Sequence, residues 1–200
     1  MGVLASIIDR SISGSFSSDM FFNVRGGAFR YCKNLTSVSF PNATSIGRTA
    51  FYNCSSLTEV SIPNATSIGD NAFESYSGLT SVSFPNATSI GSSAFASCSG
   101  LTEVFIPKAT SIGSTAFYYC TSLTSVDIPN AKSIDYWAFD GCSSLTTIYV
   151  GTESDTVCTL SSTSAIPSSV TDIYVPASLV DSYKSATNWS NYADKIKATP

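Results

Sequence analysis

The sequence predicts a curved solenoid of stacked parallel strands with a cap at each end. Two observations lead to this prediction: a unit of 22 residues that recurs along most of the chain, and a strand-like alternation inside each unit. One such unit cannot bury its apolar residues alone, so successive copies are expected to stack and share one core. The chain of 200 residues is long enough for a sizeable core, and 43% of it is hydrophobic.

The clearest marker of the period is the phenylalanine of an Ala-Phe pair. It recurs at Phe29, Phe51, Phe73, Phe95, Phe117 and Phe139. Leucine, valine and proline recur in step with it, so that the unit reads I-G-x-x-A-F-x-x-C-x-x-L-T-x-V-x-I/F-P-x-A-T-S. The copies keep one frame across residues 24–150, which are predicted to be six repeats of the solenoid.

Each repeat is predicted to contain one strand and one return. The L-T-x-V-x-I/F segment alternates with a period of two, which indicates a strand with one buried face. The proline after it ends the strand, because proline has no N–H to continue the ladder. The I-G-x-x-A-F-x-x-C-x-x-L segment spaces its apolar residues by three and four, which predicts a short helical or 3₁₀ return on the opposite side. The stacked strands would form a parallel sheet at about 4.8 Å per repeat.

The two ends are expected to cover the last apolar layers. Residues 1–23 are predicted to be an N-terminal cap with a degenerate repeat, in which Phe16 stands where valine is expected. The apolar residues of this cap with helix-like spacing are Leu4, Ile7, Ile8 and Ile12. Residues 151–200 are predicted to hold an irregular seventh repeat, because V-T-D-I-Y-V-P at 170–176 echoes L-T-T-I-Y-V-G at 145–151, followed by a helical cap. The expected cap residues are Leu179, Val180, Tyr183, Trp189, Tyr192 and Ile196.

The repeat core A-F-x-x-C-x-x-L-T-x-V-x-I-P resembles the BspA-like leucine-rich repeats, the treponemal class, over roughly residues 24–150. Residues 151–200 are similar to the extension that follows such repeats in gut bacteria and their phages. The resemblance implies a leucine-rich repeat horseshoe with its sheet on the concave side. It also implies a surface or secreted protein, in a family of which a few members adhere to host proteins or other cells. It implies no catalytic residues.

Composition argues against several function classes. The net charge of −4 and the pI of about 4.6 do not favour nucleic acid or anionic membranes as partners. No apolar run approaches the length of a transmembrane helix, and the absence of histidine excludes histidine-based catalysis and metal sites. The start, M-G-V-L-A-S-I-I-D-R, has no basic region or sustained apolar stretch typical of a signal peptide. Export by another route, loss of the signal, and a protein that is not secreted all remain open.

The cysteines are expected to be buried thiols. Cys32, Cys54, Cys98, Cys120 and Cys142 occupy one repeat position, and Tyr76 replaces the cysteine in the remaining copy. Stacked neighbours would lie about 5 Å apart, which permits a disulfide. The odd number of cysteines at this position, five, and the tyrosine favour thiols that act as small buried apolar groups instead. Cys158 is expected in the core of the C-terminal cap, and without a CxxC pair or histidine no metal site or other cofactor is predicted.

The candidates for function are departures from the repeat on the outward side of the predicted sheet. Alternation assigns two outward rows, Ser37, Glu59, Ser81, Glu103, Ser125, Thr147 and Asp172, and Ser39, Ser61, Ser83, Phe105, Asp127, Tyr149 and Tyr174. The rows carry four carboxylates and no base, and their aromatics gather in the later repeats. The predicted ligand-binding patch consists of Glu103, Phe105, Asp127, Tyr149, Asp172 and Tyr174.

Three explanations of this patch stay open at the level of sequence. The aromatics could serve stability alone, as cross-strand neighbours or under the cap. Glu103 and Asp127 could in principle form a glycosidase pair, although no pocket-forming insertion interrupts the repeats. The prediction is a non-enzymatic binding or adhesion module for a protein or glycan ligand, host proteins included. The alternative is a structural spacer or assembly component of a cell-surface or phage particle. The near-identical copies favour it, because they maintain a regular rod more obviously than a unique site. The ligand and the oligomeric state are not predicted.

Overall fold

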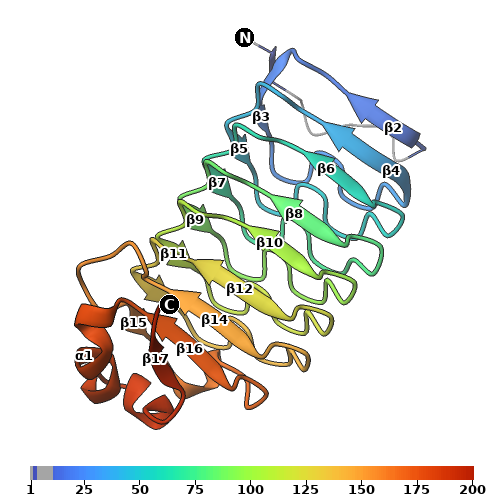
Figure 1. The fold of residues 1–200 in the computed structure, drawn as a ribbon. Coiled ribbons are helices and arrows are strands. Elements are labelled where there is room, and N and C mark those ends of the chain that lie inside the picture. Colours follow the sequence, from blue (N-terminus) through green and yellow to red (C-terminus); the bar gives the residue numbers. More distant parts are fainter. Residues whose placement is uncertain (1, 4–10) are drawn as a thin grey trace.

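The computed structural model describes residues 2–3 and 11–200, which wind into a solenoid with its coils stacked along one axis (Figure 1). The N-terminus lies at one end of the stack and a helical segment closes the other. The fold class is therefore the one predicted. Leu4, Ile7 and Ile8 of the expected N-terminal cap lie outside the described residues. In the described part of the chain, no helix is long and apolar enough to cross a membrane.

One side of the solenoid is formed by the strands predicted in the repeats, together with β17, which the sequence does not predict; all pair in parallel. They are β2 (Ser13–Ser17), β4 (Asn34–Ser39), β6 (Glu59–Ser61), β8 (Ser81–Ser83), β10 (Glu103–Phe105), β12 (Ser125–Ile128), β14 (Thr147–Val150), β16 (Asp172–Val175) and β17 (Ile196–Ala198). Strands β2, β4 and β6 form one sheet, and β8, β10, β12, β14, β16 and β17 form another. The outward side of these strands, predicted to be concave, is called the front face below. Phe16 pairs with Val38 in β4, at the valine position that the repeat assigns to it.

A further parallel sheet, which the sequence does not predict, runs along the neighbouring side of every coil. Its strands are β1 (Gly2–Val3), β3 (Phe21–Val24), β5 (Ser45–Ile46), β7 (Ser67–Ile68), β9 (Ser89–Ile90), β11 (Ser111–Ile112), β13 (Ser133–Ile134) and β15 (Thr159–Leu160). Most have two residues, which is too short for an alternating pattern to be recognised. Each Ser-Ile pair of the repeat puts its isoleucine into the core.

The core is organised around the phenylalanines that mark the period. From Phe29 to Phe139, neighbouring rings are stacked with centroids 5.1–5.4 Å apart and planes within 11° of parallel. Every ring of this column is fully buried. Each stacked pair contributes about 0.5–1.5 kcal/mol beyond the burial of its area. The constant spacing of these rings holds successive coils in one register.

The returns differ in detail from the expected helical or 3₁₀ segments. They keep i→i−3 hydrogen bonds, such as Ala50 N–H to Gly47 O and Tyr52 N–H to Thr49 O, both 3.1 Å. These bonds close separate turns, because residues between them, including Thr49 with φ 54°, adopt the left-handed conformation. The N–H of Thr49 donates instead to Asp70 O in the next coil, at 2.8 Å. The return side is therefore held by bonds between coils, which a continuous helix would not make.

The repeated cysteines are buried thiols, as predicted. Four of them donate to the carbonyl of the phenylalanine 25 residues earlier, at 2.9–3.2 Å; they are Cys54, Cys98, Cys120 and Cys142. The Tyr76 hydroxyl makes the same bond to Phe51 O, so this tyrosine replaces the thiol in both position and bonding. Burial raises the pKa of Cys54 to about 11 and that of Cys98 to about 12, which keeps both protonated at neutral pH.

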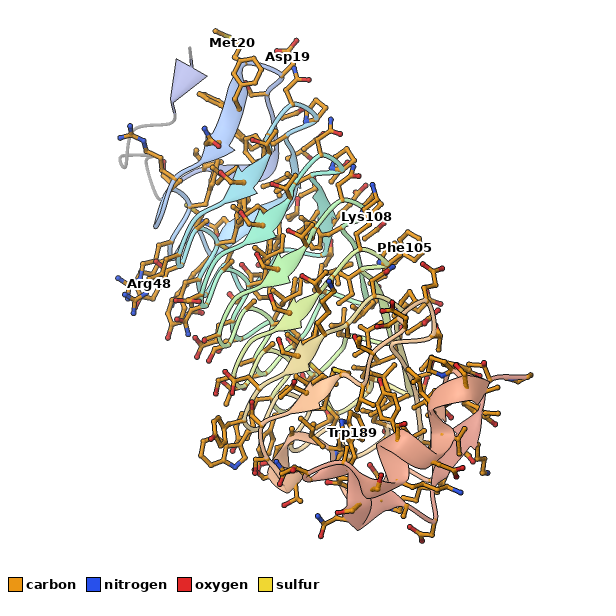
Figure 2. The ribbon with its side chains drawn as sticks, turned by 90° about the vertical axis from the view of Figure 1, so that its left-hand side faces the viewer. Asp19, Met20, Arg48, Phe105, Lys108 and Trp189 are labelled. Atoms are coloured by element: carbon orange, nitrogen blue, oxygen red, sulfur yellow. The ribbon has the colours of Figure 1, made fainter. Side chains whose placement is uncertain are left out.

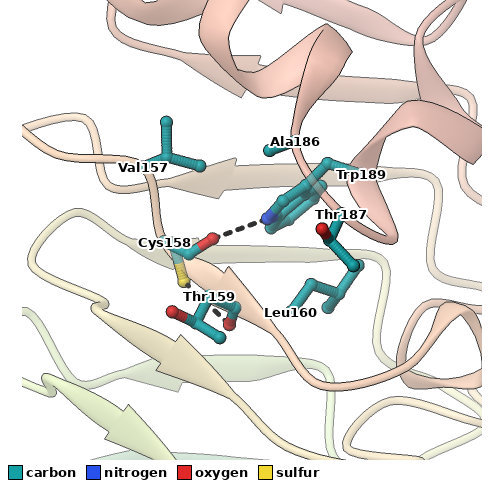
Figure 3. A pocket seen from close by; sticks show the side chains of 7 residues that line it. All are labelled: Val157, Cys158, Thr159, Leu160, Ala186, Thr187 and Trp189. Atoms are coloured by element: carbon teal, nitrogen blue, oxygen red, sulfur yellow. Dashed lines mark hydrogen bonds between the residues drawn. The ribbon is translucent and has the colours of Figure 1, made fainter.

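The C-terminal segment packs on the last coil through η2 (Ala177–Leu179), α1 (Val180–Ser185) and η3 (Trp189–Tyr192), after η1 (Thr163–Ala165) in the irregular return. Tyr183 and Trp189 are fully buried. The Trp189 Nε1–H donates to Cys158 O at 2.6 Å (Figure 3), and the Cys158 N–H donates to the Tyr183 hydroxyl at 2.9 Å. Ile196, expected at the end of the helical cap, lies in strand β17, which adds to the edge of β16.

Candidate binding face

The strand register places the predicted patch residues in the two outward rows. On the second row, Phe105 in β10 pairs with Asp127 in β12, Asp127 with Tyr149 in β14, and Tyr149 with Tyr174 in β16. On the first row, Asp172 pairs with Thr147. The serines of the earlier repeats continue the rows in β4 and β6. The outward rows inferred from alternation are therefore the rows of the structure.

The front face is interrupted between β6 and β8, which belong to different sheets. The other sheet is continuous there, with Ser67 paired to Ser89. The interruption coincides with the coil in which Tyr76 replaces the repeated cysteine. It separates a front face dominated by serine from the half that carries the candidate patch.

At its N-terminal end the patch surrounds a shallow hollow. Phe105 is 57% exposed, although it lies in the middle of a repeat. Figure 2 shows Phe105 and Lys108 on one side of the solenoid and Arg48 on the opposite side. The hollow measures about 240 Å³ and is lined by Thr102, Glu103, Val104, Phe105, Ser125 and Asp127. Three of the predicted residues, Glu103, Phe105 and Asp127, are thus brought together.

Asp127 has a second carboxylate near it that the sequence did not reveal. Partial burial, and secondarily the negative charge of Glu153, raise the pKa of Asp127 above the ordinary aspartate value. Glu153 itself accepts a hydrogen bond from Asn130 Nδ2 at 3.0 Å. Because Glu153 follows the last regular repeat, no repeat position indicates where its side chain lies.

At the C-terminal end of the patch, the two tyrosines contact each other. The rings of Tyr149 and Tyr174 are stacked, with centroids 4.8 Å apart and an interplanar angle of 15°. Both residues are half-buried. This arrangement matches the cross-strand stabilisation that remained open as an alternative to binding.

Asp172 is engaged by a base that was not expected on this face. Lys197 in β17 pairs in register with Tyr174, and its Nζ forms an ion pair with Asp172 Oδ1. Hydrogen bonds from Lys197 and then Thr171 hold the pKa of Asp172 below its usual value, and the same contact raises the pKa of Lys197. The expectation of a face without a base is therefore wrong. It failed because the K-I-K-A segment lies outside the repeat frame and was assigned to a helical cap.

The edge of the front face carries the ladder of asparagines that follow the strand-ending prolines. Asn64 Nδ2 donates to Pro41 O at 2.7 Å, and equivalent bonds are made by Asn42, Asn86 and Asn130. Lys108 takes the place of asparagine in one coil, and its Nζ donates to Asn86 Oδ1 at 2.8 Å. The ladder is therefore modified in the coil that carries Phe105.

The arrangement can bind a side chain or a small part of a ligand at the front face. Its hollow is smaller than the roughly 300–1,000 Å³ of sites that enclose a small molecule. Within residues 2–3 and 11–200, no group of three or more His, Cys, Asp or Glu could hold a metal ion. A carboxylate pair beside an exposed ring suits a cation on an apolar stem.

A larger hollow, of about 370 Å³, lies at the C-terminal cap beside Val157, Leu160 and Trp189 (Figure 3). Cys158 also lines it. Burial raises the pKa of the Cys158 thiol to about 12. Because only the thiolate is a strong nucleophile, this hollow offers no cysteine chemistry at neutral pH.

Comparison with known proteins gives matches for both sequence and fold. The family model described as BspA type leucine-rich repeat region matches in six copies, over residues 22–146 and 110–193. A leucine-rich repeat protein from T. pallidum superposes with a TM-score of 0.56 at 23% identity, covering 98% of this chain and 83% of that one. A leucine-rich repeat protein from Bacteroides ovatus gives a TM-score of 0.51 at 24% identity, covering 78% of this chain and 47% of that one. No curated protein sequence matches the chain.

Proposed function

Because the chain belongs to the BspA-type leucine-rich repeat family, we propose that it is a non-enzymatic binding or adhesion module whose front face recognises a protein ligand. The observation that carries this proposal is Phe105. Its ring is 57% exposed at a position where the preceding strand in register has Ser83. An aromatic side chain on the solvent side of a sheet gains little from the core, and exposed aromatics in contact surfaces are typical binding anchors.

The ligand that suits this surface is a segment with lysine or arginine. Glu103 and Asp127 line the hollow next to Phe105, and the protein carries a net charge of −4. The aliphatic stem of a basic residue would pack on the ring of Phe105 while its cation meets the carboxylates. Tyr149 extends the same row and would continue the contact with the part of its ring that its stack on Tyr174 leaves exposed. Asp172 and Tyr174 of the predicted patch contribute less, because Lys197 and the tyrosine stack engage them.

A glycan is the other ligand for the same face, supported by the exposed ring and the tyrosine stack. Host proteins and the surface of other cells are the partners that the family resemblance suggests. We therefore place the protein at the cell surface or outside the cell as part of this proposal.

The test is the substitution Phe105→Ser, which introduces the residue found at the equivalent position of β8. Binding is measured to immobilised extracellular matrix proteins and to a printed glycan array, with Ser83→Ala as the matched control. We expect the affinity for the protein ligand to fall about tenfold or more, as for an interface anchor. A folded Phe105→Ser protein that binds as well as the unmodified chain would remove the front face from consideration. Loss confined to the glycan array would favour the glycan form of the proposal.

A structural spacer or assembly component is the second candidate. The observation that favours it is the unbroken phenylalanine column, which maintains a regular rod. Native mass spectrometry of the purified chain distinguishes it, since an assembly component forms defined oligomers. A stable monomer with specific ligand binding would rule this candidate out.

A further inference from the structure

Two successive returns of the solenoid, away from the front face, each carry a pair of aromatic residues in contact. Tyr118 and Tyr119 lie in one return, and Tyr136 and Trp137 in the next; together they are called the return aromatic cluster. Tyr119 is 50% exposed, and Tyr136 and Trp137 are each 48% exposed. Arg48, which holds the repeat position of Tyr136 in an earlier coil, projects from this side in Figure 2.

Two members of the cluster occupy backbone positions that are unfavourable for large side chains. Tyr119 has φ 57° and Trp137 has φ 54°, both in the left-handed region. At the position of Tyr119 the first repeat also has an aromatic, Tyr31, whereas the other coils carry Asn53, Ser75, Ser97 and Gly141. At the position of Trp137 other coils carry Thr49, Asn71, Ser93 and Thr115. This conformation favours glycine and asparagine and is uncommon for bulky residues.

The backbone conformation does not favour either aromatic. Tyr119 packs on Gly141 and Tyr118, and Trp137 packs on Tyr136, but these contacts leave both side chains partly exposed. Half of each side chain is open to solvent, so the core gains only part of their surface. Large residues kept in an unfavourable conformation while half of each side chain stays exposed point to a function.

A hollow lies next to Tyr119, which contacts one of the residues that line it. It measures about 410 Å³ and is lined by Asp140, Gly141, Ser143, Pro167, Ser168 and Ser169. Gly141 also has a left-handed φ, and a Cβ at this residue would come within 2.5 Å of the Tyr119 ring. The ring of Tyr119 therefore lies against Gly141, which lines the hollow. The volume falls within the range of small-molecule sites.

The residues that line the hollow suit a neutral ligand with several hydroxyl groups. Its lining offers serine hydroxyls and the carboxylate of Asp140, and none of its six residues is basic. The Asp140 charge is also among the causes that raise the pKa of the Tyr118 hydroxyl, after partial burial and Tyr119, which places this carboxylate near the rings. A pyranose has an apolar C–H face that packs on an aromatic ring and a rim of hydroxyls that bond to carboxylate and serine oxygens.

We propose that the return aromatic cluster and the hollow beside Gly141 form a glycan-binding site, separate from the front face. One pyranose ring stacks on Tyr119 and places its hydroxyls towards Asp140 and Ser143. The neighbouring rings, Tyr136 and Trp137, contact further sugar units of the same chain. This site is independent of the front-face proposal and does not require it.

Tryptophan fluorescence provides a direct test, because the chain contains two tryptophans. Trp189 is fully buried, so changes of solvent access on ligand binding report on Trp137. The probes are a printed array of neutral and acidic oligosaccharides, followed by titration with those that bind. We expect a saturable shift in emission and protection of Trp137 from acrylamide quenching.

The deciding variants are Tyr119→Asn, which introduces the residue of an earlier coil at this position, and Asp140→Ala. Each is expected to weaken glycan binding about tenfold, while Tyr119→Asn keeps the tryptophan signal. Tyr31→Asn is the matched control, because Tyr31 also has a left-handed φ of 65° but lies in the first repeat. Phe105→Ser, on the front face, should leave the titration unchanged, which separates failure of this site from failure of the front face.

Three outcomes would overturn the proposal. The first is the absence of saturable binding to any oligosaccharide on the array. The second is glycan binding that Tyr119→Asn and Asp140→Ala leave unchanged. The third is a cluster buried by a second copy of the chain, seen as a dimer that Tyr119→Asn dissociates.

Discussion

The two ends of the front-face patch have similar residue types and differ in what those residues do. At the end formed by β10 and β12, Phe105 is exposed beside a hollow with Glu103 and Asp127. At the end formed by β14 and β16, the tyrosines stack on each other and Asp172 is paired with Lys197. The side chains of the first end are available to a ligand, whereas those of the second end already contact each other or Lys197.

The difference comes from the position of each end in the stack. A strand in the middle of the solenoid has a repeat on either side, so the strand neighbours of its outward residues are residues in equivalent positions. The last repeat strand borders the terminal segment, which supplies β17 and with it Lys197. Aromatic and acidic residues near the end of a solenoid can therefore hold the terminal segment in place. The same residue types in the middle have no terminal segment to contact.

The first prediction, with the largest expected effect, concerns the stability of the fold. Tyr174→Ala should lower the free energy of unfolding by about 1–3 kcal/mol, because it removes a half-buried ring and its stack on Tyr149. Phe105→Ala should change it by no more than about 0.5 kcal/mol, as for an exposed residue outside the core. Urea unfolding followed by circular dichroism measures both, with Phe117→Ala in the buried column as the reference for a large loss. Equal losses for Tyr174→Ala and Phe105→Ala would abolish the distinction between the two ends.

The second prediction concerns the ion pair. Lys197→Ala should lower the urea midpoint at pH 7 modestly, since exposed ion pairs contribute little. The folded pKa of Asp172 is lowered, so its contribution is present above the pKa of an unfolded aspartate, about 3.9, and is lost as pH falls through the folded value. The folded pKa of Lys197 is raised, so its contribution is present below about pH 10.4 and is lost as pH rises through the folded value.

The difference in urea midpoint between Lys197→Ala and the unmodified chain should therefore disappear in strong acid, because Asp172 is protonated in both proteins there. Lys184→Ala in helix α1 is the matched control, because this lysine is exposed in the same terminal segment. A destabilisation by Lys197→Ala that persists unchanged in acid would mean that packing, and not the charge, accounts for it.

How far the sequence predicts this molecule depends on whether a residue belongs to the repeat. The strand register and both outward rows follow from the 22-residue repeat, because each copy has equivalent residues as its neighbours. The sheet that contains β5, β7 and β9 was missed because its two-residue strands are too short to show a period. Lys197 and Glu153 were missed because both follow the last regular repeat, where position in the sequence no longer determines neighbours in space. Tyr119 and Trp137 needed the backbone conformation, since a left-handed φ is not visible in the residue spacing.

The third prediction tests the electrostatics at the hollow. Partial burial and Glu153 raise the folded pKa of Asp127, so its ionised form costs stability above that pKa, and the cost disappears as pH falls below the unfolded value. Glu153→Gln removes one cause and should lower the pKa of Asp127, measured by NMR titration of its carboxyl carbon. Glu103→Gln serves as the comparison, because Glu103 is not among the causes of the shift. An unchanged pKa in Glu153→Gln would leave burial as the sole cause.

The smallest expected effect concerns Lys108, in the coil of Phe105. Lys108→Asn should restore the asparagine ladder by donating to Pro85 O, as the equivalent residues of other coils do, and stabilise the fold by about 0.5 kcal/mol. Binding of a basic segment at the hollow should not weaken, because the substitution removes a positive charge from the edge of an acidic surface. Urea midpoints and ligand titrations of Lys108→Asn, with Asn64→Lys as the reverse change in a plain coil, separate the two effects. Weaker ligand binding by a stabilised Lys108→Asn protein would show instead that Lys108 contacts the ligand, and that the binding face extends past the end of β10.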